Sequence, residues 1–126
     1  MFDMTTKYDI IEPAQIGITS SKVTFDDGAL KIEGFGRGGS LAVEIRLESA
    51  ILVRIADEGA RLRLLQELEG KRGLVLIGAD SGLLDWLMHE CMQTRDLKEA
   101  KHFIVVAGEE IIDVVSFAVP EIEIQN

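Results

Sequence analysis

Several residue types that mark common protein classes are scarce in this chain of 126 residues. Its one cysteine, Cys91, cannot form an internal disulfide, which agrees with a reducing compartment. No stretch approaches the roughly 18 consecutive apolar residues of a membrane span. The N-terminal residues also lack the basic-then-apolar order of a secretory signal. These absences predict a cytoplasmic protein outside the membrane. With 47% hydrophobic residues, we expect it to form a single domain over residues 1–126.

Basic side chains are scarce as well. Thirteen Lys and Arg residues stand against 22 Asp and Glu residues, a formal net charge of −9. The acidic excess lies mostly in residues 64–126, and residues 109–126 contain no basic side chain. Such a surface repels phosphate backbones, so we expect no nucleic-acid partner. A protein with a basic surface is the more natural partner, and the plainer alternative is that the charge serves solubility alone.

Alternating apolar and polar residues are the clearest local pattern that is present. Val23 and Phe25 alternate with polar neighbours, and residues 41–47 repeat the period of two. The Asp27-Gly28 pair between two alternating runs is a strong hairpin signal. Residues 20–47 therefore predict an N-terminal β-meander of three antiparallel strands. Weaker strands are expected at residues 8–11 and 15–19.

The pattern after residue 49 changes from strand to helix and back. An apolar run at residues 50–55 predicts a buried strand, and leucines at helical spacing predict a helix that Asp57 caps and Gly70 ends. A strand at 73–79 precedes a second helix near 81–94, capped by Asp80 or Ser81. A C-terminal β-hairpin turns at Gly108, and a short edge segment follows Pro120. The fold class predicted is α+β, one mainly antiparallel sheet with two helices packed on one face.

The glycine-rich stretch Gly34-Phe35-Gly36-Arg37-Gly38-Gly39 has the spacing of a phosphate-binding loop. A dinucleotide site needs a helix directly after its glycines, and here a predicted strand follows. The Walker spacing and the kinase motifs are absent too. We therefore predict a wide hairpin turn in which the glycines accept positive φ angles. The exposed Arg37 at its tip remains a candidate for binding a carboxylate or phosphate of a partner.

Two histidines are the candidates for chemistry. His89 lies one helical turn from Asp85, and a carboxylate beside an imidazole can orient a general base. No nucleophile stands near them in sequence, so a surface contact along the helix is the simpler interpretation. His102 opens a strand, and no metal-ligand spacing joins it to His89. We therefore assign no catalytic residue, cofactor or metal from the sequence.

Candidate binding residues are easier to name than catalytic ones. Trp86 lies at the margin of the apolar stripe of the second helix, where it closes the core edge or anchors a partner. Asp85 and His89 share that helix, and Arg37 is expected at the glycine turn. Asp113 is expected to project from a sheet face or edge toward a cationic partner, or to guard the edge against aggregation.

The segments DSGLLDWLMHE (80–90) and KHFIVVAGEEIIDVVS (101–116) together resemble small uncharacterised bacterial accessory proteins. Some of these are carried on mobile gene cassettes, and others accompany toxins as immunity proteins. The resemblance covers about a third of the chain and rests on a helix followed by a hairpin. It implies a compact accessory protein that works by contact, and it transfers no catalytic residue.

These observations lead to three hypotheses. The first is a binding protein that meets a partner with a basic surface through Trp86 and nearby acids. The second is a small enzyme or small-molecule-binding domain with a pocket between sheet and helices, where Asp85, His89, His102 and Arg37 form the polar set. The third is a homodimer or larger homo-oligomer in which apolar strands near the C-terminus pair across a two-fold axis.

Overall fold

The computed structural model describes residues 7–68, 73–79 and 81–125. In these ranges the chain forms nine strands, two α-helices and one 3-10 helix. The strands are β1 (Lys7–Glu12), β2 (Ser20–Asp26), β3 (Ala29–Phe35), β4 (Leu41–Leu47), β5 (Ala50–Asp57), β6 (Val75–Ala79), β7 (Lys101–Ala107), β8 (Glu110–Ser116) and β9 (Glu121–Ile124). The helices are η1 (Glu58–Ala60), α1 (Leu62–Glu67) and α2 (Gly82–Glu90). Antiparallel strands with two α-helices confirm the α+β class.

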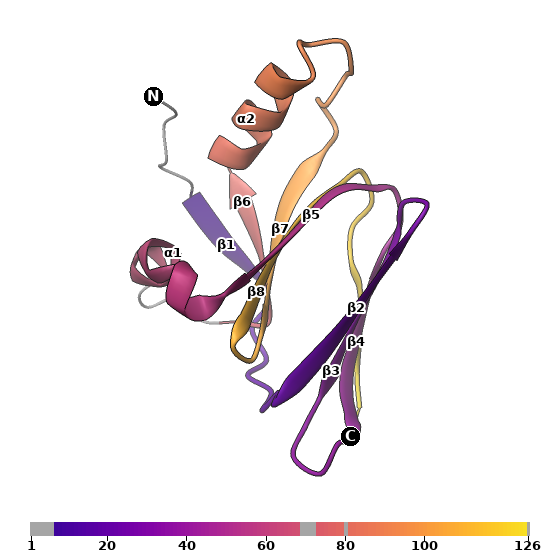
Figure 1. The fold of residues 1–126 in the computed structure, drawn as a ribbon, viewed down its shortest axis with the longest axis vertical. Coiled ribbons are helices and arrows are strands. Elements are labelled where there is room, and N and C mark those ends of the chain that lie inside the picture. The colour runs from indigo at the N-terminus through magenta and orange to yellow at the C-terminus, as the bar shows by residue number, and fades with distance from the viewer. Residues whose placement is uncertain (1–6, 69–72, 80, 126) are drawn as a thin grey trace.

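The strands form two sheets and not the single sheet expected. A five-stranded sheet has the order β1-β6-β7-β8-β5, and a four-stranded sheet has the order β2-β3-β4-β9. Figure 1 shows the two sheets side by side, with α1 and α2 on the side of the five-stranded sheet. Side chains from both sheets share the largest hydrophobic cluster, which includes Ile32 and Ile45 from one sheet and Phe103 and Ile112 from the other. Buried apolar area between the sheets is therefore the main source of stability.

The hairpins follow the turn chemistry of the sequence. Asp27 and Gly28 have φ angles of 49° and 84° and join Asp26 to its partner Ala29, as an Asp-Gly hairpin requires. The glycine stretch forms the predicted turn between β3 and β4, where Gly38 and Gly39 adopt φ angles of 87° and 82°. The predicted C-terminal hairpin is also present, since β7 pairs with β8 around the turn at Gly108.

Two strand predictions differ from the structure and a third is confirmed. Residues 50–55 lie in β5, which is an edge strand with exposed positions and not a buried one. Residues 15–19 form no strand. The strand from residues 8–11 is present as β1, but it pairs with β6, far from it in sequence.

Side chains cap η1 and α2 but not α1, and each α-helix packs on its own apolar cluster. Asp57 accepts a hydrogen bond from the Gly59 amide and caps η1, so the predicted cap starts a 3-10 helix before α1. Ser81 caps α2 through the Leu84 amide, while Asp80 and Gly70 lie outside the described residues. The second helix ends before the predicted residue 94, because Met92 and Gln93 have positive φ angles that an α-helix excludes.

Candidate functional site

A row of buried polar side chains lies across the five-stranded sheet, on the face turned away from the four-stranded sheet. His102 is the neighbour of Phe103 along β7, and Asp113 is the neighbour of Ile112 along β8. Phe103 and Ile112 point into the cluster shared by the two sheets. Because successive side chains of a strand point to opposite faces, His102 and Asp113 lie on the outer face. Only 2% of His102 and none of Asp113 is exposed.

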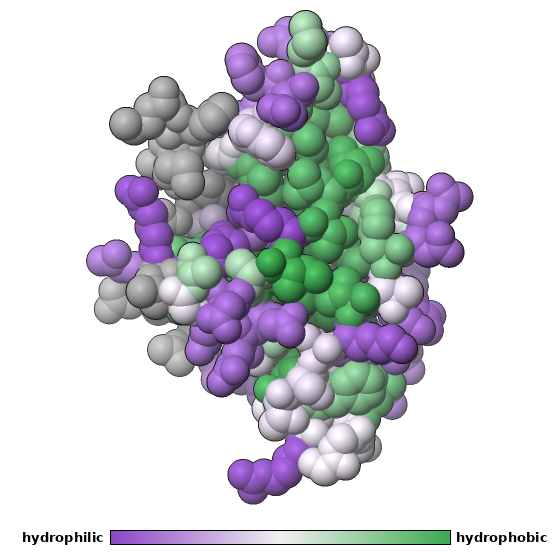
Figure 2. Space-filling model, viewed as in Figure 1, coloured by the Kyte–Doolittle hydropathy of each residue, from purple (hydrophilic) through white to green (hydrophobic). Residues whose placement is uncertain are grey.

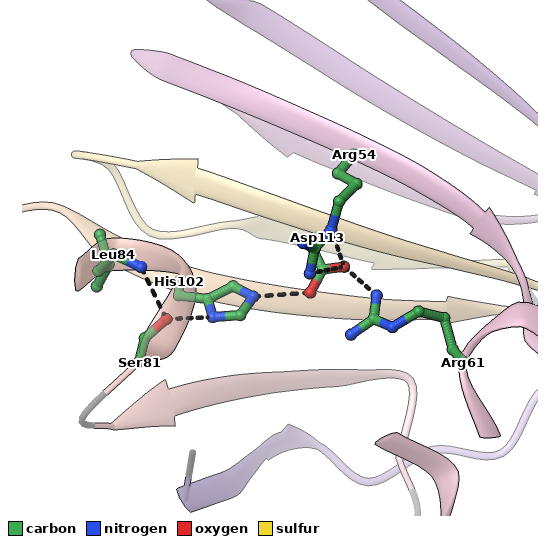
Figure 3. A network of polar contacts seen from close by, with 6 residues as sticks. All are labelled: Arg54, Arg61, Ser81, Leu84, His102 and Asp113. Atoms are coloured by element: carbon green, nitrogen blue, oxygen red, sulfur yellow. Dashed lines mark hydrogen bonds and ion pairs between the residues drawn. The ribbon is translucent and has the colours of Figure 1, made fainter. Parts of the chain in front are cut away.

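Hydrogen bonds link Ser81, His102 and Asp113 in a row (Figure 3). The Ser81 Oγ lies 2.7 Å from His102 Nδ1, and His102 Nε2 lies 2.7 Å from Asp113 Oδ1. A neutral imidazole with its proton on Nε2 satisfies both contacts, since it donates to the carboxylate and accepts from the serine hydroxyl. The Tyr8 ring meets the imidazole edge-on, with the ring centres 6.5 Å apart. Every polar atom of the His102 ring therefore has a partner.

Two arginines balance the charge of Asp113. Arg54 of β5 places its Nε 3.1 Å and its Nη2 3.0 Å from Asp113 Oδ2. Arg61, at the start of α1, donates to the same oxygen. Burial by itself raises the pKa of Asp113. The hydrogen bond from His102 and the charges of Arg54 and Arg61 outweigh this effect and lower the pKa from 3.8 to about 2.

The row of serine, histidine and aspartate has the members of a hydrolase triad, but its geometry is that of a structural network. In the triad the histidine bonds the serine through Nε2 and the aspartate through Nδ1, and here the order is reversed. Ser81 has φ −70° and ψ 123°, the ordinary extended conformation of a helix cap and not a strained nucleophile turn. Its side chain is occupied by the Leu84 amide and is only 3% exposed. This arrangement fixes the start of α2 to the sheet.

The residues predicted to form a binding site are not all brought together. Asp85 and His89 are exposed on α2, and Trp86 on the same helix is partly buried. Arg37 lies in the turn between β3 and β4, at the opposite end of the molecule from α2 (Figure 1). The expected surface position of Asp113 is wrong, because its carboxylate is buried between His102 and the two arginines.

One feature of the sequence does indicate this network, although it is not a pattern of strand or helix periodicity. Asp113 and Arg54 are each the single charged residue inside an otherwise apolar run, IIDVV and ILVRI. A lone charge in a buried strand needs an opposite charge nearby, because an unpaired buried ion is costly. The roles of Ser81 and Arg61 depend on tertiary contacts between distant segments and leave no such local mark.

No metal centre is formed by the described part of the chain, where no three His, Cys, Asp or Glu side chains are placed to hold an ion. His89 and His102 differ in environment, since one is exposed and the other is enclosed by Ser81 and Asp113. None of the described helices is long and apolar enough to span a membrane.

An apolar surface lies beside the polar network, along α2 and the first half of β5. No residue of α2 is fully buried, although its leucines pack on a cluster that includes Val115. We call this the α2–β5 surface, and its partly buried members are Ile51, Leu52, Leu83, Leu84, Leu87, Met88 and Cys91. Figure 2 shows hydrophobic side chains gathered in one continuous area between α2 and β5 on this face. Continuous apolar areas of this kind mark interaction sites more often than isolated exposed residues do.

Comparison with known proteins adds no assignment. No protein-family model matches the chain, and no curated protein and no solved structure matches it significantly.

Proposed function

We propose that this protein acts by binding another protein, and that the α2–β5 surface is the contact. The observation that carries the proposal is the half-buried state of α2. Its apolar residues pack on the sheet from one side only, so none of them reaches full burial. A partner that covers these residues would remove further apolar area from water, which is the main driving force of association.

The placement of the helices supports such a contact. Ile111, Asp113 and Val115 alternate along β8 with residues of the core between the sheets. Leucines of α1 cluster with Ile111, and those of α2 cluster with Val115. We infer from this alternation that both helices pack on the outer face of the five-stranded sheet, with the polar network between them. A rigid network beneath α2 would present its apolar side chains in a fixed arrangement, which lowers the entropic cost of binding.

Charge favours a partner with a basic surface. The chain carries −9, and Asp85 and Glu90 are exposed on α2 itself. A basic partner is attracted over a distance, and this attraction raises the association rate at low salt. A second copy of the chain carries the same acidic charge and is repelled. An accessory protein that works by contact is also what the resemblance to cassette-borne and immunity proteins implies.

Trp86→Ala is the variant that tests the proposal, because Trp86 is partly buried on α2 and directly precedes Leu87, a member of the α2–β5 surface. The full chain is used to capture partners from the native host, and each captured protein is then purified and titrated against wild type and variants. We expect the affinity of the specific partner to fall by about tenfold or more, as is typical when a tryptophan anchor is removed. We also expect the association rate to fall as salt is added.

Phe25→Ala is the matched control, because Phe25 is an aromatic residue exposed to 50% on β2 of the other sheet. It should leave the affinity unchanged. Equal binding by wild type and both variants would show that the contact lies elsewhere. A chain that captures no specific protein, but self-associates, would support the homo-oligomer hypothesis and overturn this one.

A further inference from the structure

The edge strand β5 lacks the protection that the other sheet edges have. The sheets end in four described edge strands, β1 and β5 in one and β2 and β9 in the other. All four carry two exposed charged side chains, namely Lys7 and Asp9 in β1, Lys22 and Asp26 in β2, Glu121 and Glu123 in β9, and Arg54 and Asp57 in β5, but those of β5 are engaged in contacts within the protein. Such charges discourage the addition of a further strand.

The charged side chains of β5 bind other groups of the same protein. The guanidinium of Arg54 is drawn onto the sheet face by Asp113, and the carboxylate of Asp57 accepts from the Gly59 amide. Ile55 between them is 49% exposed. At eight residues, β5 is also the longest described strand. An apolar strand of this kind is a template for pairing with another chain.

The register shows which backbone groups of β5 point away from the sheet. The Glu58 amide donates to the Glu109 carbonyl, and these two residues continue the register of β5 with β8, so theirs is a hydrogen-bonded pair. Hydrogen-bonded and non-bonded pairs alternate along antiparallel strands. Residues 54 and 56 therefore bond β8, while the N–H and C=O groups of Val53, Ile55 and Asp57 point outward. No strand among the described residues pairs with this outer side of β5.

An acidic hollow lies at the end of the same strand. Its volume is about 370 Å³, and it is lined by Asp57, Glu58, Gly59, Leu65 and Glu109. Three carboxylates beside one leucine match a lysine or arginine side chain, whose stem is apolar and whose head is cationic. The charge of the hollow thus indicates that a segment bound at the free edge of β5 would carry a basic side chain.

From these observations we propose that β5 binds an extended segment of a partner protein as an added strand, with a basic side chain of that segment in the acidic hollow. The inference rests on the proposed protein-binding function and specifies how the partner is held. Outward backbone groups of Val53, Ile55 and Asp57 supply the hydrogen bonds, and the hollow selects the charge, as in other cases of strand addition.

Random peptides displayed on phage and selected against the full chain provide a probe. We expect the enriched peptides to alternate apolar residues and to carry lysine or arginine. The most frequent peptide, labelled with fluorescein, is then titrated by fluorescence anisotropy. Ile55→Pro removes an outward N–H without breaking a bond to β8, and it should lower the affinity by about tenfold or more. Ile55→Thr keeps the N–H and favours a strand, so we expect a change of less than about threefold.

A pair of double variants tests the hollow. Glu58→Lys with Glu109→Lys should weaken binding of the basic peptide by about tenfold at low salt. Glu121→Lys with Glu123→Lys makes the same change in net charge on β9 and should have little effect. Circular dichroism and the unfolding midpoint check that each variant is folded.

Three results would overturn the strand addition. They are the absence of any enriched peptide, enriched peptides without basic residues, and equal binding by wild type and Ile55→Pro. The same variants separate this inference from the function on which it rests. If the host partner is lost with Trp86→Ala but retained with Ile55→Pro, the binding function stands and the added strand is wrong. If no specific host partner exists, both are wrong.

Discussion

Asp113 shows how one residue can be buried as an ion. Its carboxylate faces one imidazole and two guanidinium groups, so each oxygen has a donor and its charge is balanced. The partners come from β5, β7 and the start of α1, and His102 extends the row to the start of α2. A single side chain thus joins four elements, and its ionisation should influence the stability of the whole fold.

Acid should reveal this contribution. The folded-state pKa of Asp113 is about 2 and the ordinary value is 3.8, so on acidification the unfolded chain takes up the proton first. The stabilisation is fully present above pH 3.8 and is lost as the pH falls toward 2. We expect wild type to lose about 2 kcal/mol more unfolding free energy than Asp113→Asn between neutral pH and pH 2.

Chemical denaturation at several pH values measures this difference. Asp113→Asn should be less stable at neutral pH but should respond less to acid. Asp85→Asn makes the same change in charge at an exposed position of α2 and controls for net charge. Parallel acid responses of wild type and Asp113→Asn would contradict the assigned charge balance.

Among the elements, the strand β3 depends on a glycine that faces the core. A Cβ atom added to Gly34 would lie 2.9 Å from Ile18 Cδ1 and 2.9 Å from Val43 Cγ1. Both distances are too short for carbon atoms, and the branched Val43 side chain cannot easily turn away. The segment that carries Ile18 can therefore pack this closely on β3 and β4 only because residue 34 has no side chain.

Gly34→Ala should destabilise the fold by about 1–3 kcal/mol through overpacking. Gly17→Ala is the matched control, since a Cβ there meets no atom within 4 Å. The unfolding free energies of the two variants, measured by urea titration, give the comparison. If the two substitutions have the same effect, the space around Gly34 is not limiting.

Local elements were easier to predict than their partners. The strands near residues 20–47 and the Asp27-Gly28 turn follow from alternation and turn chemistry, both of which operate over a few residues. The division into two sheets was missed because β4 and β5 are separated by only two residues and yet belong to different sheets. Pairing of β1 with β6 and of β4 with β9 depends on contacts between distant segments, which no local pattern records.

The polar network was missed for a related reason. Within their own strands His102 is the second residue and Asp113 the central one, and a polar residue at either position by itself suggests exposure to solvent. Their burial follows from β7 and β8 lying inside the five-stranded sheet, which is a property of the assembled fold. The apolar stripe of α2 follows from the sequence, but only the structure shows that none of its residues is fully buried.

At the scale of the whole molecule, charge and apolar surface act in opposite directions. The α2–β5 surface favours association, while a net charge of −9 on every copy opposes self-association. We expect the chain to be monomeric at low salt over a range of concentrations, as measured by multi-angle light scattering after gel filtration. Salt screens the repulsion, so any self-association should appear first at high ionic strength. A dimer at low salt that persists on dilution would contradict this expectation.

The way the chain divides its strands between the sheets has a consequence for synthesis. The five-stranded sheet takes β1 from the start of the described chain, and the four-stranded sheet takes β9 from its end. During translation β4 therefore lacks one of its two neighbouring strands until residues 121–124 are synthesised, and β1 lacks its partner until β6 is synthesised. Neither sheet can be completed early in synthesis. The nascent polypeptide should therefore become resistant to proteases late and in a single step.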